Sequence, residues 1–132
     1  MNIPGRIIHR DRVGKGEIIV ADDGMRRSLY LDGDTLQSSM SLDRPAVLVM
    51  EYSRAMMCAL LFVPQPRRIL LIGLGGASLV KFLLELFPDT FLEVAEIDPG
   101  VIEAARQFFS LAKMTVDCKL FRSPARNWYS RD

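Results

Sequence analysis

The chain has 132 residues, of which 49% are hydrophobic, and its 17 basic and 16 acidic residues leave a formal net charge of +1. This length fits one domain, with at most a small appendage, and the apolar content is sufficient for a core. Scattered basic residues and a near-neutral charge do not favour nucleic-acid binding. No apolar run approaches membrane-spanning length and residues 1–6 lack a signal-peptide core, so we expect a cytoplasmic protein without membrane contact.

The two cysteines and the single histidine form no metal-binding or redox motif, and no metal is expected. Cys58 falls in an apolar helical stretch, and we interpret it as a small core residue in a reducing compartment. His9 stands alone, so a surface or hydrogen-bonded role is favoured over a catalytic one.

The first 44 residues predict a small antiparallel sheet. Turn-forming residues at 14–16 and 22–24 separate short apolar stretches, which predict strands over 6–8, 17–21 and 27–31. The polar stretch 37–41 predicts a loop or a very short strand. We therefore place an N-terminal β-sheet domain at 1–44 and a second domain at 45–132.

The second domain is expected to begin with a long helix, from Pro45 to about Val63. Its apolar residues lie nearly all round the helix, so we expect burial on most faces. A Pro-Gln-Pro sequence ends the helix and leads into the central strand.

Residues 67–106 predict a strand, a glycine-rich turn, a helix, a second strand, an acidic turn and a second helix. The strand at 69–72 has no polar alternation, which is typical of a strand buried on both faces of a parallel sheet. The first helix is predicted at 78–86 and the next strand at 91–95. Pro99 suits the first turn of the second helix, with Asp98 as its N-cap. A third strand is predicted at 114–121, and a turn with a short helical end at 124–129.

The glycine turn and the acids after the second strand indicate a nucleotide-type site. Gly73, Gly75 and Gly76 let bare backbone N–H groups approach a ligand. About twenty residues later, Glu96 or Asp98 has the spacing of a carboxylate that binds ribose hydroxyls. The alternative is that the glycines only form a tight turn and that Asp98 is only a helix cap.

Three segments resemble the spermidine synthase (polyamine aminopropyltransferase) family, in its bacterial spermidine-synthase-like branch. They are Leu31-Asp32-Gly33 with Gln37-Ser38-Ser39, the Glu51-Tyr52 helix, and ILLIGLGG followed by VAEIDPGVIEAAR. The resemblance implies an α/β fold, with a small antiparallel β-sheet before a methyltransferase-like Rossmann domain. It also implies enzymes that move the aminopropyl group of decarboxylated S-adenosylmethionine to putrescine.

The resemblance assigns roles to individual residues. Gly73, Gly75 and Gly76 match the glycine turn beside the nucleoside, Glu96 the carboxylate that holds the ribose, and Asp98 the acid two residues on. On the polyamine side, Gln37 resembles a glutamine that lines the family's site. Tyr52 falls near the position of the family's Tyr-His pair, but this sequence has no histidine beside it.

Several family features are absent. The acidic residue of the glycine turn is replaced by Ala77 or Ser78, and a Gly-Asp pair that reaches the adenine aligns with Ser123-Pro124. The catalytic aspartate lies beyond a fourth strand, past Asp132. Asp43, Glu51 and Tyr52 are the nearest groups to the amine, but none matches that aspartate, so the catalytic residue is unknown.

The pattern therefore predicts a Rossmann half-fold truncated after its third strand, with the strand at 69–72 as an apolar edge. Exposed apolar edges invite pairing, so we expect a homodimer or larger oligomer that covers it, unless residues 122–132 fold back over it.

Three functions stay open: a catalytically silent binder of a nucleoside or polyamine, a transferase completed by a partner chain, and an interaction module without a ligand. An NAD-binding Rossmann unit is a weaker fourth, because Ser78 stands where its third glycine is expected.

Overall fold

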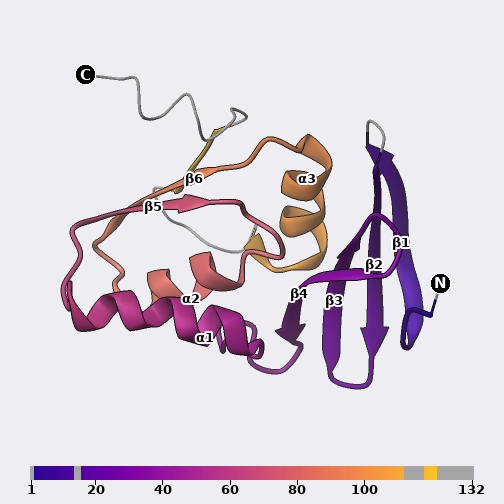
Figure 1. Ribbon diagram of the computed structural model, residues 1–132, viewed down its shortest axis with the longest axis horizontal. Helices are drawn as coiled ribbons and strands as arrows, with labels where there is room; N and C mark the ends of the chain where they lie inside the picture. The colour runs from indigo at the N-terminus through magenta and orange to yellow at the C-terminus, as the bar shows by residue number, and fades with distance from the viewer. Residues whose placement is uncertain (1, 14–15, 112–117, 122–132) are drawn as a thin grey trace.

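A computed structural model describes residues 2–13, 16–111 and 118–121, and its elements form two sheets with helices between and beside them (Figure 1). The first sheet is antiparallel, with strand order β1-β2-β3-β4. Its strands are β1 (Arg6–Val13), β2 (Gly16–Asp23), β3 (Arg26–Leu31) and β4 (Thr35–Ser41). The predicted α/β class, with an antiparallel sheet first, is confirmed.

The fourth strand corrects the prediction of a loop or very short strand at 37–41. β4 has seven residues and pairs antiparallel with β3. Its polar side chains have partners there, since the hydroxyls of Ser28 and Ser39 lie 3.0 Å apart. Pairing and burial outweigh the weak strand propensity of this polar stretch.

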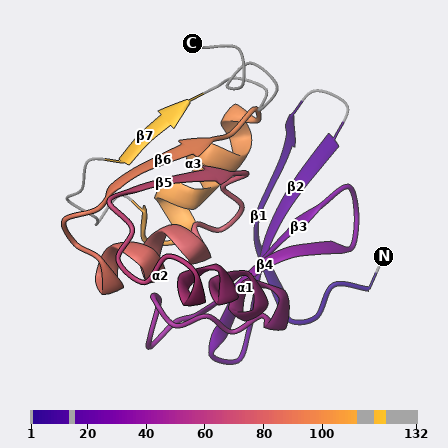
Figure 2. The ribbon, with the colours of Figure 1, turned by 60° about the vertical axis from the view of Figure 1, so that its left-hand side comes forward.

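The second sheet is parallel, in the order β5-β6-β7, and Figure 2 shows its three strands side by side. Its elements in chain order are β5 (Arg68–Ile72), α2 (Ser78–Leu86), β6 (Phe91–Ala95), α3 (Pro99–Phe108) and β7 (Cys118–Phe121). The predicted bounds of α2 and β6 are confirmed. The predictions for 114–117, for the turn at 124–129 and for Ser123, Pro124 and Asp132 lie outside the described residues.

The helix predicted from Pro45 begins later and is shorter. α1 (Glu51–Met56) continues as a 3-10 helix, η1 (Met57–Leu61), and residues 45–50 are not helical. Two β-branched valines in that segment, Val47 and Val49, disfavour helix. The Arg54 side chain instead donates to the Leu48 carbonyl at 2.9 Å.

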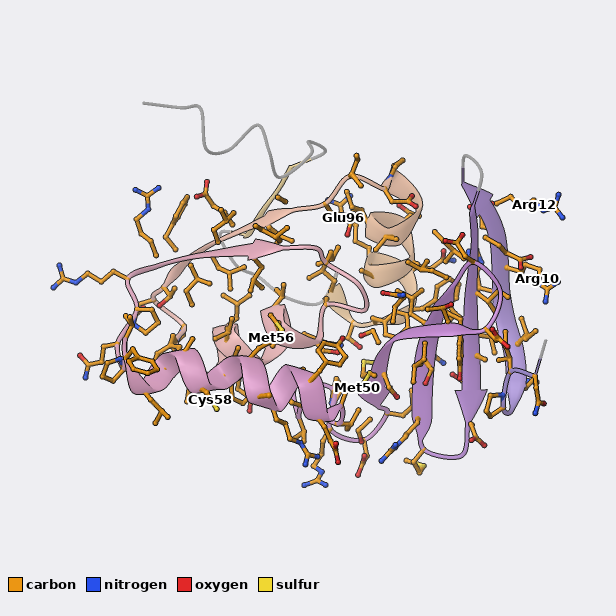
Figure 3. All side chains as sticks on the ribbon, in the orientation of Figure 1. Arg10, Arg12, Met50, Met56, Cys58 and Glu96 are labelled. Carbon is orange, nitrogen blue, oxygen red and sulfur yellow. The ribbon has the colours of Figure 1, made fainter. Side chains whose placement is uncertain are left out.

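The expected burial of this helix on most faces is also wrong. Ser53 is the one buried residue of α1, and η1 has none. Cys58, interpreted as a core residue, is exposed, and Figure 3 shows it on the side of the helix away from β5. The apolar composition of this segment therefore leaves an exposed surface rather than a buried one. None of the helices in the described ranges is long and apolar enough to cross a membrane.

One hydrophobic core joins the two sheets. Buried side chains of β2, β3 and β4 pack in the same cluster as those of α2, β6 and α3, including Val20, Leu29, Met40, Val80, Leu92, Val101 and Phe109. The Arg27 guanidinium adds a polar link, since it holds Asp22 through two hydrogen bonds and donates to the Phe108 carbonyl at 3.0 Å. The boundary at 44/45 stays a prediction, and the core extends across it.

Within the described part of the sheet, β5 is an edge strand that pairs with β6 alone, as predicted. It is not buried on both faces, because the side chains of Leu70 and Ile72 are 43% and 58% exposed. Both views show α1 and α2 on the same side of this strand (Figures 1 and 2).

Candidate functional site

The glycine-rich turn after β5 has the backbone that only glycine adopts easily. Gly73 and Gly75 have φ values of +88° and +54°, and Ala77 also lies in the left-handed region at +57°. The N–H of Gly73 is already used, since it donates to the Ala95 carbonyl at 2.8 Å. In the described structure the N–H groups of Gly75 and Gly76 have no protein acceptor. Gly75 is half-buried, so its N–H is available to a ligand, whereas Gly76 is buried.

Gly73 and Gly76 have different surroundings in the turn. A Cβ on Gly73 would meet nothing within 4 Å, so this position faces open space. A Cβ on Gly76 would lie 2.7 Å from the Ser38 hydroxyl oxygen and 3.0 Å from a ring carbon of Phe109. Glycine at position 76 is therefore required for packing of the turn on β4 and on Phe109, directly after α3, whether or not a ligand binds.

Glu96 follows β6 and turns its carboxylate toward the glycine turn (Figure 3). Oε2 accepts a hydrogen bond of 2.9 Å from the backbone N–H of Leu74, and the carboxylate is buried. Oε1 accepts from the N–H groups of Ile97 and Asp98, at 2.8 and 2.9 Å. A carboxylate offers about four lone-pair sites, so three protein bonds leave about one for a ligand hydroxyl.

Asp98 caps α3 as predicted. Its Oδ1 accepts from the N–H of Gly100 at 2.8 Å, and Pro99 occupies the first turn of the helix. The side chain is half-buried beside the loop that carries Glu96. A ligand-binding role for Asp98 stays a prediction.

A cavity of about 210 Å³ lies between the glycine turn, β4 and α1. It brings together four of the predicted site residues: Gln37, Tyr52, Gly73 and Gly75. The Tyr52 hydroxyl donates to the Gln37 carbonyl at 2.7 Å, which joins α1 to β4 at the cavity wall. Partial burial raises the pKa of the Tyr52 hydroxyl, so it acts as a donor rather than as a base near neutral pH.

Gly76, Glu96 and Asp98 do not line this cavity, although Leu74 does and is hydrogen-bonded to Glu96. The predicted residues thus form two adjoining groups, one on each side of the turn. Asp43 and Glu51, the carboxylates predicted nearest an amine, are exposed and do not line the cavity.

Three serines of the cavity wall, Ser38, Ser53 and Ser78, were not among the predicted site residues. The hydroxyl of Ser38, which is buried, lies 3.1 Å from that of Ser78 at the start of α2. The position of Ser78, directly after the turn and at a helix start, is the signal that could have identified it. Ser38 was hidden in a stretch interpreted as a loop. Across residues 2–13, 16–111 and 118–121 there is no cluster of three His, Cys, Asp or Glu residues that could hold a metal.

No protein-family model matches the chain. The polyamine aminopropyltransferase of Chromobacterium violaceum is 48% identical to it over 95 residues, which cover 72% of this chain and 36% of that protein. The chain belongs to the spermidine synthase (polyamine aminopropyltransferase) family. The predicted resemblance is therefore confirmed.

Solved spermidine synthases show the same fold. A probable spermidine synthase from Corynebacterium glutamicum aligns with a TM-score of 0.76 at 19% identity, over 97% of this chain and 47% of that one. A spermidine synthase in complex with the transition-state analogue AdoDATO aligns with a TM-score of 0.69 at 19% identity, over 93% and 42% of the two chains. The chain spans less than half the length of these relatives.

Proposed function

We propose that the chain binds a nucleoside of the decarboxylated S-adenosylmethionine class at the carboxyl ends of β5 and β6. The observation that carries this proposal is the buried Glu96 carboxylate, hydrogen-bonded to the turn at Leu74. Its remaining acceptor capacity suits a ribose hydroxyl, and the N–H group of Gly75 is a donor on the same turn. The relative solved with AdoDATO adds support, because it shares this fold.

Binding, rather than complete aminopropyl transfer, is the property that we propose for this chain. Transfer needs an acceptor for the proton of the attacking amine. No Asp, Glu or His lines the described cavity. The raised pKa of Tyr52 keeps its hydroxyl protonated near neutral pH, so it cannot take the proton of the amine. Gln37 and Tyr52 are proposed to face the amine side, and an active transferase would take its proton acceptor from outside this cavity, for example from a partner chain.

Isothermal titration with 5′-methylthioadenosine and with decarboxylated S-adenosylmethionine tests this proposal. We expect at least one of them to bind, and Glu96→Gln to weaken that binding at least tenfold. Glu103→Gln, a change of an exposed acid on α3, is the matched control and should leave the affinity unchanged. If Glu96→Gln lowers only the melting temperature and leaves the dissociation constant unchanged, Glu96 is structural and the ribose assignment is wrong.

A second candidate function, self-association, is favoured by the exposed apolar surface. Leu70 and Ile72 of β5 are exposed, and Leu61 and Phe62 after α1 are 80% and 87% exposed. Exposed apolar side chains on an edge strand favour pairing with another chain. We propose that β5 pairs antiparallel with β5 of a second copy, centred on Leu70. This register places Arg68 opposite Ile72 of the second copy, so no like charges face each other.

Sedimentation velocity at low micromolar concentration tests the pairing. We expect a dimer for the unchanged chain and a monomer for Leu70→Lys, which places a charge at the centre of the paired edge. Leu36→Lys changes an equally exposed leucine on β4 and should remain a dimer. A monomeric unchanged chain would overturn the second candidate without affecting the first.

A further inference from the structure

A second cleft lies between α1, η1 and α2, whose helices α1 and α2 lie on the same side of β5 (Figures 1 and 2). Its volume is about 560 Å³, which is within the range of small-molecule sites in proteins. Residues 46–48 complete its wall. None of its lining residues also lines the cavity beside the glycine turn, so the two are separate.

Most of the cleft wall is apolar and open to water. Val47 and Leu86 are 42% and 51% exposed. Phe82 and Leu86 lie four residues apart on α2 and therefore share one face, and Met57 of η1 lines the same cleft. An apolar group that covers these side chains removes their surface from water, which is favourable. An aromatic ring suits this wall, because it can contact both the Phe82 ring and the Met57 thioether.

The same cleft has one cation and one anion in its lining, one from each helix. Arg54 of α1 donates through Nε to the Leu48 carbonyl at 2.9 Å, which fixes the direction of its guanidinium. In the described structure the two terminal nitrogens of Arg54 have no protein partner, and neither does the carboxylate of Glu85 on α2. Among the described ion pairs there is none between Arg54 and Glu85.

These groups match a ligand that carries both charges. The terminal N–H groups of a guanidinium bind a carboxylate through two parallel hydrogen bonds. A carboxylate such as that of Glu85 accepts charge-assisted hydrogen bonds from an ammonium. A ligand with a carboxylate alone would be repelled by Glu85, and one with an ammonium alone would be repelled by Arg54.

We propose that the cleft between α1 and α2 binds the zwitterion of an aromatic α-amino acid. The carboxylate of the ligand binds Arg54, its ammonium binds Glu85, and its ring packs against Phe82 and Met57. This site is independent of the proposed nucleoside site, because the two cavities share no residue.

NMR chemical-shift titration of the isotope-labelled chain with L-phenylalanine tests the site. We expect saturable shifts of backbone amides in α1 and α2, with a dissociation constant of about 1 mM or below, which is reasonable for a ligand of this size. Hydrocinnamate is the same molecule without the ammonium, and phenethylamine is the same molecule without the carboxylate. Each should bind more weakly than phenylalanine by about fivefold or more, because it loses one charge-assisted contact.

Two variants assign the charges. Glu85→Gln should remove the preference for phenylalanine over hydrocinnamate, and Arg54→Gln should remove the preference over phenethylamine. A loss of structure would weaken the binding of all three probes alike, so the ratio of affinities within each variant reports the charge. Glu103→Gln changes an exposed acid on α3 outside the cleft, and this control should leave every ratio unchanged.

Three results would overturn the proposal. An absence of saturable shifts with millimolar phenylalanine excludes the site. Equal or tighter binding of either singly charged probe, or unchanged ratios in both charge variants, excludes the pairing of the zwitterion with Arg54 and Glu85. Shifts centred on Gly75 rather than on α1 and α2 would place the ligand in the other cavity. Nucleoside binding is measured separately, so its failure would leave this proposal standing.

Discussion

The backbone N–H of Leu74 donates a 2.9 Å hydrogen bond to Oε2 of Glu96, and this bond joins the turn after β5 to the end of β6. Both residues are buried. Without the carboxylate, three backbone donors lose their acceptor, including those of Ile97 and Asp98. We expect Glu96→Ala to lower the free energy of unfolding by about 3 kcal/mol, because unsatisfied buried donors each cost about 1–3 kcal/mol.

Urea denaturation followed by circular dichroism measures this loss. Glu103→Ala, on the exposed side of α3, should change the unfolding free energy by less than about 0.5 kcal/mol. Equal stability of the Glu96 and Glu103 variants would show that Glu96 does not hold the turn.

The contact between Gly76 and Ser38 predicts a steric effect. Gly76→Ala places a methyl group 2.7 Å from the Ser38 hydroxyl oxygen, so we expect a loss of about 1–3 kcal/mol in unfolding free energy. Ser38→Gly combined with Gly76→Ala should recover part of that loss, because it removes the nearest obstructing atoms. Gly73→Ala, where space is open but φ is positive, should show no recovery with Ser38→Gly. A double-mutant cycle measured by thermal unfolding checks this coupling.

Lys81 on α2 predicts a rise in stability at alkaline pH. It is buried, donates to the Phe109 carbonyl at 2.9 Å and contacts the Met40 sulfur, and burial lowers its pKa from 10.5 to about 8. Between pH 8 and 10.5 the unfolded chain therefore binds more protons than the folded one, so stability from this group increases with pH.

The free energies of unfolding of the unchanged chain and of Lys81→Met at pH 7.5 and 9.5 measure this effect. We expect the unchanged chain to gain stability relative to the variant as the pH rises. The same pH dependence in both proteins would contradict the assignment to Lys81.

The ion pair of Asp22 and Arg27 predicts a dependence of the same sign at acidic pH, where stability again rises with pH. The hydrogen bonds from Arg27 lower the pKa of Asp22 below its ordinary value of 3.8. Its contribution to stability is therefore complete above about pH 4 and is lost as the pH falls through the lowered folded value. We expect Asp22→Asn to cost about 1 kcal/mol at pH 7 and less at pH 2, as measured by urea denaturation. A constant cost at both pH values would rule out the charge as its origin.

The elements with strong local signals could be predicted from the sequence. α2 and β6 have the predicted bounds, because helical apolar spacing and a short apolar strand are unambiguous between Gly76 and the Pro88-Asp89 stop. The cap of α3 by Asp98 followed from its position before Pro99. These local signals also placed the glycine turn and Glu96 at neighbouring strand ends.

The elements that depend on distant contacts could not be predicted. β4 is polar, and its strand is defined by pairing with β3 and by the Ser28–Ser39 hydroxyl pair. Cys58 lies in an apolar sequence, yet its exposure depends on what covers the helix. The Ser38–Ser78 pair of the cavity forms only because β4 and α2 lie side by side. No local sequence pattern indicates that contact.

Ser38 fills the volume in which a side chain at position 76 would begin, so neither position can enlarge without a change in the other. Among related chains, a bulkier residue in the turn should occur together with a smaller one in the fourth strand. The two sites are expected to evolve as a pair, although one belongs to the antiparallel sheet and the other to the glycine turn after β5.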